Sequence, residues 1–289
     1  MEKIELLEKR DLEIILSNSI KKILFIGETD TGKTTLIKDI ANFLYEKEKV
    51  YIFDCDIGQS HVGPPTTIGY AKVENKIENF YLNPERFCFV GSVTPSSVIV
   101  EFITGVIKID RYLSEKKGKI LIDTTGYIKN EIGISLKISK IEILKPDFVI
   151  LLERENELKK IKSFLNYSGI KYKNIKVENL PSKNIEERAN YRKKIFREYF
   201  SNLKLIDLNL NKISLKIINF KNVDILNSDL KGRICSLKNE FFEEFSLGII
   251  NKRENEKVEI FIPEKNLHSK EIKGIIISGF ILGLENDKE

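Results

Sequence analysis

The sequence holds few of the residues that build metal centres and disulfide frameworks. It has three cysteines (Cys55, Cys88 and Cys235) and two histidines (His61 and His268) in 289 residues. The cysteines are odd in number, far apart and without a CxxC pair, which disfavours a zinc site or a disulfide framework. Two histidines also disfavour a histidine-rich metal site, and we expect both to be ordinary loop or surface residues.

Long hydrophobic runs are also missing. No apolar stretch approaches the ~20 residues that cross a bilayer. Residues 1–15 alternate acids, bases and apolar side chains, unlike the basic-then-apolar layout of a signal peptide. We therefore expect a cytoplasmic protein that does not bind a membrane. A content of 42% hydrophobic and 31% charged residues indicates a globular chain.

Positive charge is concentrated in one part of the chain. The whole chain has a net charge of +5, whereas Arg154 to Arg197 holds 13 basic and 5 acidic residues, a net charge of +8. Such a zone suits an anionic partner, either nucleotide phosphates or a nucleic-acid backbone. A lysine-rich solvated surface is the alternative.

Short apolar runs alternate with helical stretches over the first 200 residues. The pattern predicts strands at 22–27, 50–53, 87–91, 119–123 and 148–152, and helices at 5–19, 34–46 and 97–113. Strands that are apolar on both faces and separated by helices predict an α/β fold, with a parallel sheet covered by helices on both faces.

The pattern changes after residue 202. Apolar runs at 205–210, 258–262 and 275–284 look like strands with few helical segments between them. We predict a first domain at 1–202 that holds the parallel sheet. A small, β-rich and barrel-like domain should follow at 203–289.

The first predicted strand leads into a phosphate-binding motif. Gly27 to Thr35 reads G-x-x-x-x-G-K-[ST], between a buried strand and a helix, which is the context that a P-loop requires. Backbone N–H groups and the helix N-terminus should cradle phosphates there. The motif predicts a P-loop NTPase fold and a nucleotide site formed by Gly27, Thr29, Asp30, Thr31, Gly32, Lys33, Thr34 and Thr35.

The loop also predicts the cofactors. Lys33 should reach the β- and γ-phosphates, and the Thr34 hydroxyl should bind Mg²⁺. GTPases of this class usually carry an N/TKxD segment after a late strand, and Leu152 to Asn156 lacks it. We therefore expect ATP and Mg²⁺.

Three carboxylates follow predicted strands. A phosphoryl-transfer site needs one carboxylate near Mg²⁺ and one that receives the acceptor proton. Asp54 and Asp56 follow the strand that we expect to neighbour the P-loop strand, whereas Asp123 begins a D-T-T-G run similar to the DTxG element of many P-loop NTPases. Each could instead cap a loop. The residues alone leave open which acid is the base and which serves Mg²⁺.

Together, these segments resemble the polynucleotide 5′-hydroxyl kinases. This family includes kinase subunits of eukaryotic RNA-processing complexes and compact archaeal and bacterial forms. The resemblance covers roughly the first 200 residues, and the P-loop combined with D-x-D-x-G-Q-S is its specific part. The matching segments are Gly27 to Thr35, Asp54 to Ser60, Gly63 to Thr67, Gly91 to Pro95, Thr124 to Tyr127 and Arg188 to Phe200.

The resemblance implies roles for individual residues. Asp56, or alternatively Asp54, would act as the base toward the 5′-hydroxyl, and the other acid would help Thr34 to hold Mg²⁺. Gln59 would line the acceptor end. A clasp made of Thr125, Gly126 and Tyr127 would hold the substrate against the phosphates. That clasp often carries Trp where this chain has Tyr127.

A helix predicted at 184–200 would form an arginine-rich lid. Arg188 and Arg192 are four residues apart and share a face, whereas Arg197 points about 140° away from Arg192. The resemblance assigns this segment to a lid over the triphosphate. We therefore expect Arg188 and Arg192 to act in catalysis and Arg197 to lie on the surface.

The function that we expect is transfer of the ATP γ-phosphate to a 5′-hydroxyl end of RNA or DNA. The alternative is an ATP-binding switch or scaffold subunit of an RNA-processing complex with little kinase activity. A small-molecule kinase is a third possibility, which the basic zone disfavours because a short acceptor needs no extended positive track.

Overall fold

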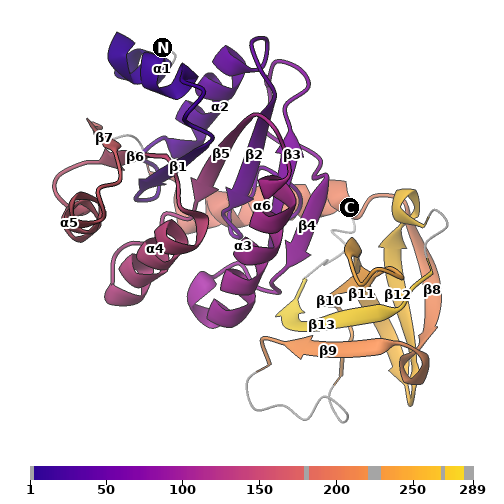
Figure 1. The fold of residues 1–289 in the computed structure, drawn as a ribbon. Coiled ribbons are helices and arrows are strands. Elements are labelled where there is room, and N and C mark those ends of the chain that lie inside the picture. Colours follow the sequence, from indigo (N-terminus) through magenta and orange to yellow (C-terminus); the bar gives the residue numbers. More distant parts are fainter. Residues whose placement is uncertain (1–2, 179–181, 221–228, 268–270, 283–289) are drawn as a thin grey trace.

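The computed structural model of the chain describes residues 3–178, 182–220, 229–267 and 271–282, so His268 lies outside the described residues. The strands form two sheets, one of seven strands and one of six. In Figure 1 the first sheet lies in the indigo to magenta part of the chain and the second in the orange to yellow part. Among the described residues, no helix could cross a membrane. The cytoplasmic location stays a prediction.

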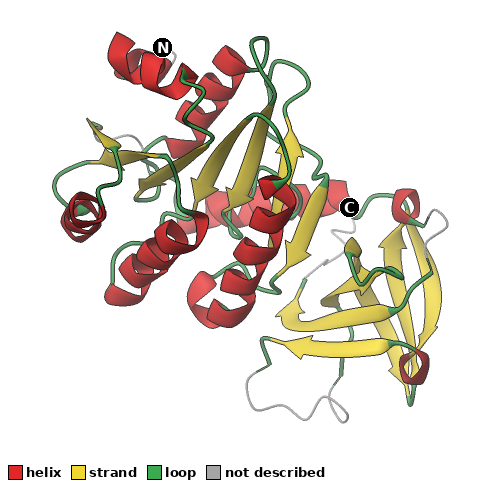
Figure 2. Cartoon of the chain, viewed as in Figure 1, coloured by secondary structure: helices red, strands yellow, loops and turns green. Residues whose placement is uncertain are grey.

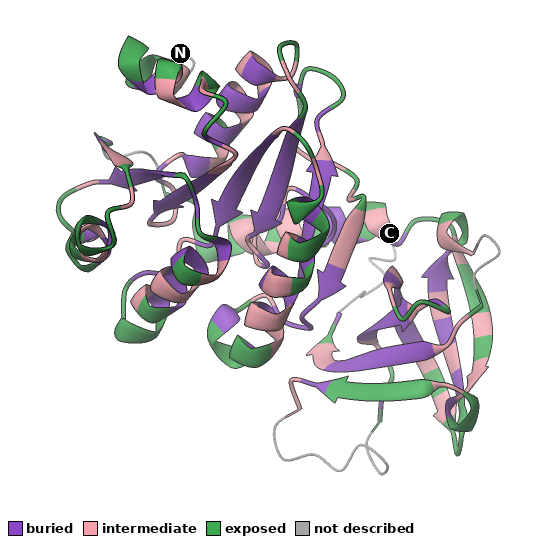
Figure 3. Ribbon diagram, viewed as in Figure 1, coloured by how far each residue is buried: buried purple, intermediate pink, exposed green. Residues whose placement is uncertain are grey.

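The first sheet has a parallel centre, as the sequence predicted. The strand order is β4-β3-β2-β5-β1-β6-β7, and all neighbours from β2 to β7 in this order are parallel. These strands are β1 (Lys22–Gly27), β2 (Val50–Cys55), β5 (Lys119–Thr124), β6 (Phe148–Glu153) and β7 (Tyr172–Lys176). Figure 3 shows the central strands buried along nearly their whole length, which requires helices on both faces.

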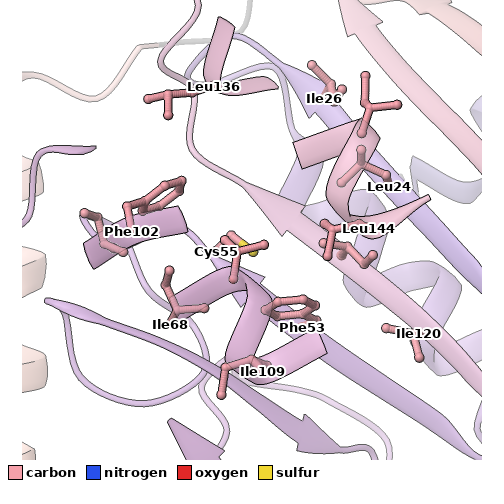
Figure 4. Packing of buried hydrophobic residues seen from close by; sticks show 14 of the residues in the cluster. Leu24, Ile26, Phe53, Cys55, Ile68, Phe102, Ile109, Ile120, Leu136 and Leu144 are labelled. Carbon is pink, nitrogen blue, oxygen red and sulfur yellow. The ribbon is translucent and has the colours of Figure 1, made fainter. Parts of the chain in front are cut away.

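Helices cover both faces of this sheet, and each face has its own hydrophobic cluster. The helices on one face are α1 (Lys9–Leu16) and α2 (Lys33–Leu44). The other face carries α3 (Ile99–Ser114), α4 (Glu131–Leu144) and α5 (Lys159–Ser168). Figure 4 shows part of the hydrophobic cluster beneath α3, α4 and α5. Phe102 of α3, Leu136 of α4 and Cys55 of β2 contribute to this cluster. The P-loop strand therefore lies in a layer that helices cover on both faces.

The order of the central strands corrects one prediction. We placed the strand that ends at Asp54 beside the P-loop strand, but β5 lies between β1 and β2. A local apolar pattern predicts a strand but does not tell where the crossover after it returns. As a result, Asp123 lies near the end of β5, next to the P-loop strand. Asp54 lies on β2, one strand further out, directly opposite Asp123 in the register of the sheet.

Two further differences concern element types. The edge strands β3 (Thr67–Lys72) and β4 (Arg86–Phe89) are antiparallel to their neighbours, so the sheet is mixed. The helix predicted at 5–19 is divided into a 3-10 turn, η1 (Lys3–Leu6), and α1, because Glu8 caps α1 in a capping box with Asp11. The sequence prediction did not include β3, α4, α5 or β7.

The second sheet has the order β8-β12-β11-β10-β13-β9, and within the described part of the chain only its pair β13 and β9 is parallel. Its strands are β8 (Leu203–Asn209), β9 (Ser214–Ile218), β10 (Arg233–Lys238), β11 (Glu244–Glu254), β12 (Lys257–Pro263) and β13 (Gly274–Ile281). In the described residues this sheet is not a closed barrel, because β8 and β9 are its two edges. The barrel-like shape stays a prediction. Short 3-10 turns complete the fold: η2 (Pro95–Ser97), η3 (Leu210–Lys212) and η4 (Glu264–Asn266).

The predicted lid helix is α6 (Ile185–Tyr199), which connects the two sheets (Figure 2). Asn184 caps its first turn in a capping box with Glu187. At the other end, Phe196 and Phe200 are buried in a cluster with side chains of the second sheet. The second sheet therefore anchors the carboxyl end of the helix, while the amino end reaches the P-loop. The division into domains at 1–202 and 203–289 stays a prediction.

The Gly91–Pro95 segment forms part of the junction between the sheets. The Gly91 carbonyl accepts hydrogen bonds from Ser278 Oγ (2.6 Å) and Asn219 Nδ2 (3.0 Å). Gly91 has a φ of +70°, and a Cβ atom there would lie 2.6 Å from Ile218 Cδ1. Only glycine fits this contact. One motif of the family resemblance thus joins the P-loop sheet to the second sheet.

Candidate active site

The phosphate loop lies between the end of β1 at Gly27 and the start of α2 at Lys33. Gly32 caps the helix with a φ of +85°, and Asp30 has a φ of +60°. The N–H groups of the first helical turn have no partners within the helix and carry partial positive charge. Phosphate oxygens are the natural partners for these groups.

The side chain of Lys33 is folded back on this loop. Its ammonium group donates hydrogen bonds to the carbonyl oxygens of Gly27 (3.0 Å) and Glu28 (2.8 Å). Burial lowers the pKa of Lys33, while the negative charges of Asp123 and Asp56 oppose that shift. The ammonium thus lies near two carboxylates, where phosphate oxygens can replace the loop carbonyls as its partners.

Asp56, the second acid of the D-x-D-x-G-Q-S motif, directly follows β2 and lines a cavity together with Lys33. Its Oδ1 accepts hydrogen bonds from the N–H groups of Gly58 and Gln59, both at 3.0 Å. Gln59 Nε2 in turn donates to the carbonyl oxygen of Arg188 in the lid helix (3.2 Å). The turn therefore fixes one oxygen of Asp56 and links the acceptor end to the lid.

Asp54 is enclosed by its own loop. It is 1% exposed and does not line the cavity. Burial raises the pKa of Asp54 to about 8, and the charges of Asp123 and Asp56 add to this effect. This geometry favours a role in shaping the loop over the catalytic and metal-binding roles that we expected from the sequence. Its carboxylate accepts hydrogen bonds from Asp56 N (2.7 Å), Ser60 Oγ (3.1 Å), His61 N (2.6 Å) and Val62 N (3.0 Å).

Asp123 and Thr34 meet beside the start of α2. The Thr34 hydroxyl donates to Asp123 Oδ2 at 3.0 Å, and burial raises the pKa of Asp123. A hydroxyl and a carboxylate are oxygen ligands of the kind that Mg²⁺ prefers. Among the described residues, no group of three or more His, Cys, Asp or Glu side chains could hold a metal. The donor set fits Mg²⁺, which takes one or two protein ligands beside nucleotide phosphates and water.

The clasp segment, Thr125 to Tyr127, crosses the phosphate loop in close contact. A Cβ atom on Gly126 would lie 2.3 Å from Thr29 Oγ1 and 2.4 Å from Thr29 N, so a side chain cannot fit there. The Tyr127 hydroxyl accepts a hydrogen bond from Asn130 Nδ2 (2.8 Å), and its ring packs against the core cluster of that face. The contact places the clasp directly against the predicted nucleotide site.

The lid helix is closed over the phosphate loop. Arg188 Nη2 forms an ion pair with Asp30 Oδ2 at 2.6 Å, and the Tyr191 hydroxyl donates to the Ser60 carbonyl at 2.9 Å. Burial and the charge of Arg188 lower the pKa of Arg192, and the charge of Asp56 opposes them. Arg197 lies in a different surface hollow. Arg188 thus lies at the phosphate loop, whereas Arg192 is linked to the site only through the interaction of its charge with Asp56. The catalytic roles of both arginines stay predictions.

One cavity brings most of these groups together. Among the residues predicted from the sequence, its lining includes Thr29, Asp30, Gly32, Lys33, Thr34, Thr35, Asp56, Gln59, Gly126 and Arg188. Gly27, Thr31, Asp54, Thr125, Tyr127 and Arg192 lie outside this lining. The cavity therefore joins the expected donor site to the expected acceptor side.

Four lining residues were not predicted: Lys38, His61, Phe80 and Lys183. We expected His61 to be an ordinary loop residue, but its ring stacks on Phe80 with centroids 5.0 Å apart. Its Nδ1 also lies 3.1 Å from the Tyr191 hydroxyl. The position of His61 directly after D-x-D-x-G-Q-S was the signal that could have identified it.

The comparisons with known proteins identify the family. The profile of the family described as "mRNA cleavage and polyadenylation factor CLP1 P-loop" matches residues 27–202. The chain belongs to this family. The match begins at the first glycine of the phosphate loop and ends just beyond the lid helix, so it covers every element that lines the cavity.

The chain is similar to archaeal proteins over about half of its length. A polyribonucleotide 5′-hydroxyl-kinase of Methanocaldococcus jannaschii is 44% identical over 148 residues, and one of Pyrococcus horikoshii is 42% identical over 149 residues. Each match covers 50% of this chain and 41% of the relative. The CLP1 homolog of Brugia malayi is 28% identical over 153 residues, which is 48% of this chain and 35% of that protein. The chain thus matches less than half the length of these relatives.

Solved structures show the same fold over a longer span. The structure of a Clp1p–Pcf11p complex superposes with a TM-score of 0.73, covering 93% of this chain and 76% of that chain at 14% identity. A second structure of the Clp1p–Pcf11p interface gives a TM-score of 0.74 at 13% identity. At this identity the similarity establishes the fold of CLP1 family members, including the second sheet.

Proposed function

We propose that this chain is an ATP-dependent polynucleotide 5′-hydroxyl kinase, which transfers the γ-phosphate of ATP to the 5′-hydroxyl end of RNA or DNA. The observation that carries the proposal is that the phosphate loop, Asp56 and Arg188 line one and the same cavity. The family and the names of its archaeal relatives support the same activity. The basic zone at 154–197 suits a polynucleotide acceptor.

The donor site is formed by the phosphate loop. The N–H groups from Thr29 to Thr35 bind the phosphates of ATP, and Lys33 exchanges its loop carbonyls for β- and γ-phosphate oxygens. Thr34 and Asp123 are the residues that would hold Mg²⁺. When bound, Mg²⁺ neutralises charge on the β- and γ-phosphates. Asp54 supports this site indirectly, by holding the loop that carries Asp56.

Asp56 is the proposed base. Two N–H groups fix its Oδ1, and its Oδ2 makes no hydrogen bond that we find among the described residues, which leaves it for the acceptor hydroxyl. As the 5′-oxygen bonds to the γ-phosphorus, its proton passes to Asp56, and the bond from the γ-phosphorus to the bridging oxygen breaks to release ADP. Gln59 and the clasp hold the acceptor end in line.

The lid supplies positive charge to the transferred group. Arg188 pairs with Asp30 in the closed lid, beside the phosphate loop. A γ-phosphate can compete for this guanidinium, because Arg binds phosphate with two parallel hydrogen bonds. Arg192 lies close enough to Asp56 for their charges to interact, so it can act on the same group. Both arginines stabilise the negative charge of the transition state.

The test uses ATP labelled at the γ-phosphate with short 5′-hydroxyl RNA, 5′-hydroxyl DNA and a free nucleoside as acceptors. We expect label on RNA, DNA or both, much less on the nucleoside, and none with Lys33→Ala. Normal ATP binding without transfer to any acceptor would reject the kinase.

The alternative is an ATP-binding switch or scaffold subunit with little kinase activity. The observation in its favour is that Lys33 and Arg188 are both engaged by groups of the chain itself. In that case ATP would bind and be hydrolysed slowly, and the acceptors would not change the rate. Faster ATP turnover on addition of 5′-hydroxyl RNA or DNA would favour the kinase.

A further inference from the structure

Two buried lysines lie on α4, and neither of them lines the cavity. Lys137 and Lys140 are each 1% exposed, and they share the buried face of the helix with Leu136 and Ile141. Burying an amine among apolar side chains costs free energy unless it makes compensating contacts. The two lysines differ in such contacts, and this difference indicates what each does.

Lys137 is bonded to the clasp. Its Nζ donates to the carbonyl oxygen of Thr125 and, at 2.9 Å, to the Thr125 hydroxyl. Burial lowers the pKa of Lys137 well below its ordinary value. These bonds survive loss of the charge, because a neutral amine still has two N–H groups to donate. The amine thus holds both the backbone and the side chain of the first clasp residue.

Lys140 has no such bond. Among the described groups, its Nζ has no hydrogen-bond partner, and it lies 5.1 Å from the ring centre of Phe102. The two lysines are three residues apart on one face and equally buried, but only Lys137 contacts the clasp. The charge of Lys140 also acts on Lys137. Lys140→Met is therefore a control for the loss of a neighbouring buried amine while the bonds from Lys137 to the clasp are kept.

The start of α4 holds the other end of the clasp. Asn130 caps the helix through Gly133 N (2.9 Å), and its Nδ2 donates to the Tyr127 hydroxyl (2.8 Å). A Cβ atom on Gly133 would lie 2.7 Å from the Tyr127 carbonyl oxygen, so the helix and the clasp backbone are in direct contact. Between these attachments, Gly126 lies against the phosphate loop.

We propose that Lys137 is a positioning residue, which fixes the clasp on α4 and thereby places the acceptor's 5′ end against the phosphate loop. The inference rests on the proposed kinase function, because it assigns the clasp to the acceptor. A methionine at this position would fill the same space but could not hold the Thr125 backbone. The expected defect is therefore in use of the acceptor, not in binding of ATP.

The experiment compares Lys137→Met with two controls, Lys140→Met and Lys119→Met. Lys119 is also buried, and its Nζ donates to the carbonyl oxygens of Ser17 (2.7 Å) and Ile20 (2.6 Å), which are not part of the cavity lining. We expect Lys137→Met to raise the acceptor KM about tenfold, because the clasp loses a hydrogen bond from a buried amine. The ATP KM should change less than about twofold. Neither control should change the acceptor KM, although Lys119→Met should lower the thermal midpoint.

A second variant keeps the test decisive if Lys137→Met does not fold. Thr125→Val removes only the hydroxyl partner and should raise the acceptor KM by a smaller factor, about threefold. An unchanged acceptor KM in the folded variants would overturn the proposal. So would equal increases in the acceptor and ATP KM, or an equal effect of Lys140→Met.

A binding measurement separates this inference from the kinase proposal. Fluorescence anisotropy of a 5′-hydroxyl oligonucleotide, with a non-hydrolysable ATP analogue present, reports acceptor affinity without transfer. If the wild type transfers no phosphate, the kinase proposal fails. Weaker oligonucleotide binding by Lys137→Met, but not by Lys140→Met, would still support the role of Lys137 in the clasp. Equal affinities in all three proteins, or no binding by any of them, would overturn it.

Discussion

The two sheets differ in the charge that they bury. Among the described residues, the second sheet and its loops bury one charged side chain, Glu244, and its carboxylate faces the first sheet, where it accepts hydrogen bonds from Phe89 N and Cys88 Sγ. The first sheet and its helices bury Asp11, Lys33, Asp54, Lys119, Asp123, Lys137, Lys140 and Glu153.

Most of the charge buried in the first sheet lies at or behind the cavity. Buried charges weaken a fold unless other groups compensate for them. Asp54 and Asp123 lie at the carboxyl ends of the parallel strands β2 and β5, and Lys33 begins the helix that follows the phosphate loop. The second sheet instead packs apolar side chains on α6 and β4. The first sheet therefore carries the charged site, whose burial costs stability, while the second sheet supports the lid that closes over it.

The largest expected effect comes from neutralising a charge of the site. If activity survived that change, the buried charge would not serve catalysis. Asp56→Asn keeps the shape of the side chain and removes the base. We expect kcat to fall about 10³-fold while ATP affinity stays near normal, because proton transfer is lost and the phosphate loop is intact. Steady-state label transfer and ATP titration measure both quantities. Near-normal turnover would show that Asp56 is not the base.

The lid offers a comparison of two arginines on one helix. Arg188 reaches the phosphate loop, whereas Arg197 lies in a separate surface hollow. Arg188→Ala should lower kcat about 10²-fold, because a charge that stabilises the transition state is removed. Arg197→Ala should change kcat less than about twofold. Equal effects of the two changes in the transfer assay would mean that the lid does not act through Arg188.

Gly126 tests the contact between the clasp and the phosphate loop. Gly126→Ala should reduce kcat/KM for transfer about tenfold or more, because a Cβ atom cannot fit 2.3 Å from Thr29 Oγ1 and must displace the clasp. Gly169→Ala is the control, since nothing lies within 4 Å of a Cβ atom there and only its φ of +68° opposes the change. The control should cost about 1 kcal/mol of stability and no activity. A fully active Gly126→Ala would show that the clasp moves freely.

Glu244 tests the charge that the second sheet buries, and its replacement has the smallest expected effect on activity. Burial raises the pKa of Glu244. A carboxyl group with a raised pKa in the folded state stabilises the fold below its unfolded pKa, and this contribution is lost as the pH rises toward the folded value. Glu244→Gln keeps an acceptor for Phe89 N but cannot ionise. The thermal midpoint of the variant, relative to that of the wild type, should therefore increase as the pH rises from about 4 to 7. The rate of phosphate transfer should not change. A thermal midpoint of the variant that falls relative to that of the wild type as the pH rises would contradict this account.

Local sequence predicted those parts of the site that local residues determine. The phosphate loop, the D-x-D-x-G-Q-S turn and the lid helix each lie within one short segment, and each has the predicted backbone type. The order β2-β5-β1 was not predictable in this way, because it depends on crossovers between distant segments. This order places Asp123 beside Thr34 and leaves Asp54 inside its own loop.

The buried lysines show a second limit of local reasoning. Lys137 and Lys140 follow the same helical spacing as Leu136, Ile141 and Leu144, and this spacing was a signal that they belong to the buried face. The helix itself was not predicted from the sequence, and lysine is almost never fully buried. The contact between Lys137 and Thr125 joins residues 12 positions apart through tertiary packing, which no single motif encodes.

The most direct test of the account follows the destination of the γ-phosphate in one reaction. ATP labelled at the γ-phosphate is mixed with 5′-hydroxyl RNA, and with 5′-phosphate RNA as the blocked control, and the products are separated. The account predicts that most of the label appears at the 5′ end of the hydroxyl RNA, that little appears as inorganic phosphate, and that the blocked RNA receives none. Label found only as inorganic phosphate, at the same rate with either RNA, would contradict it.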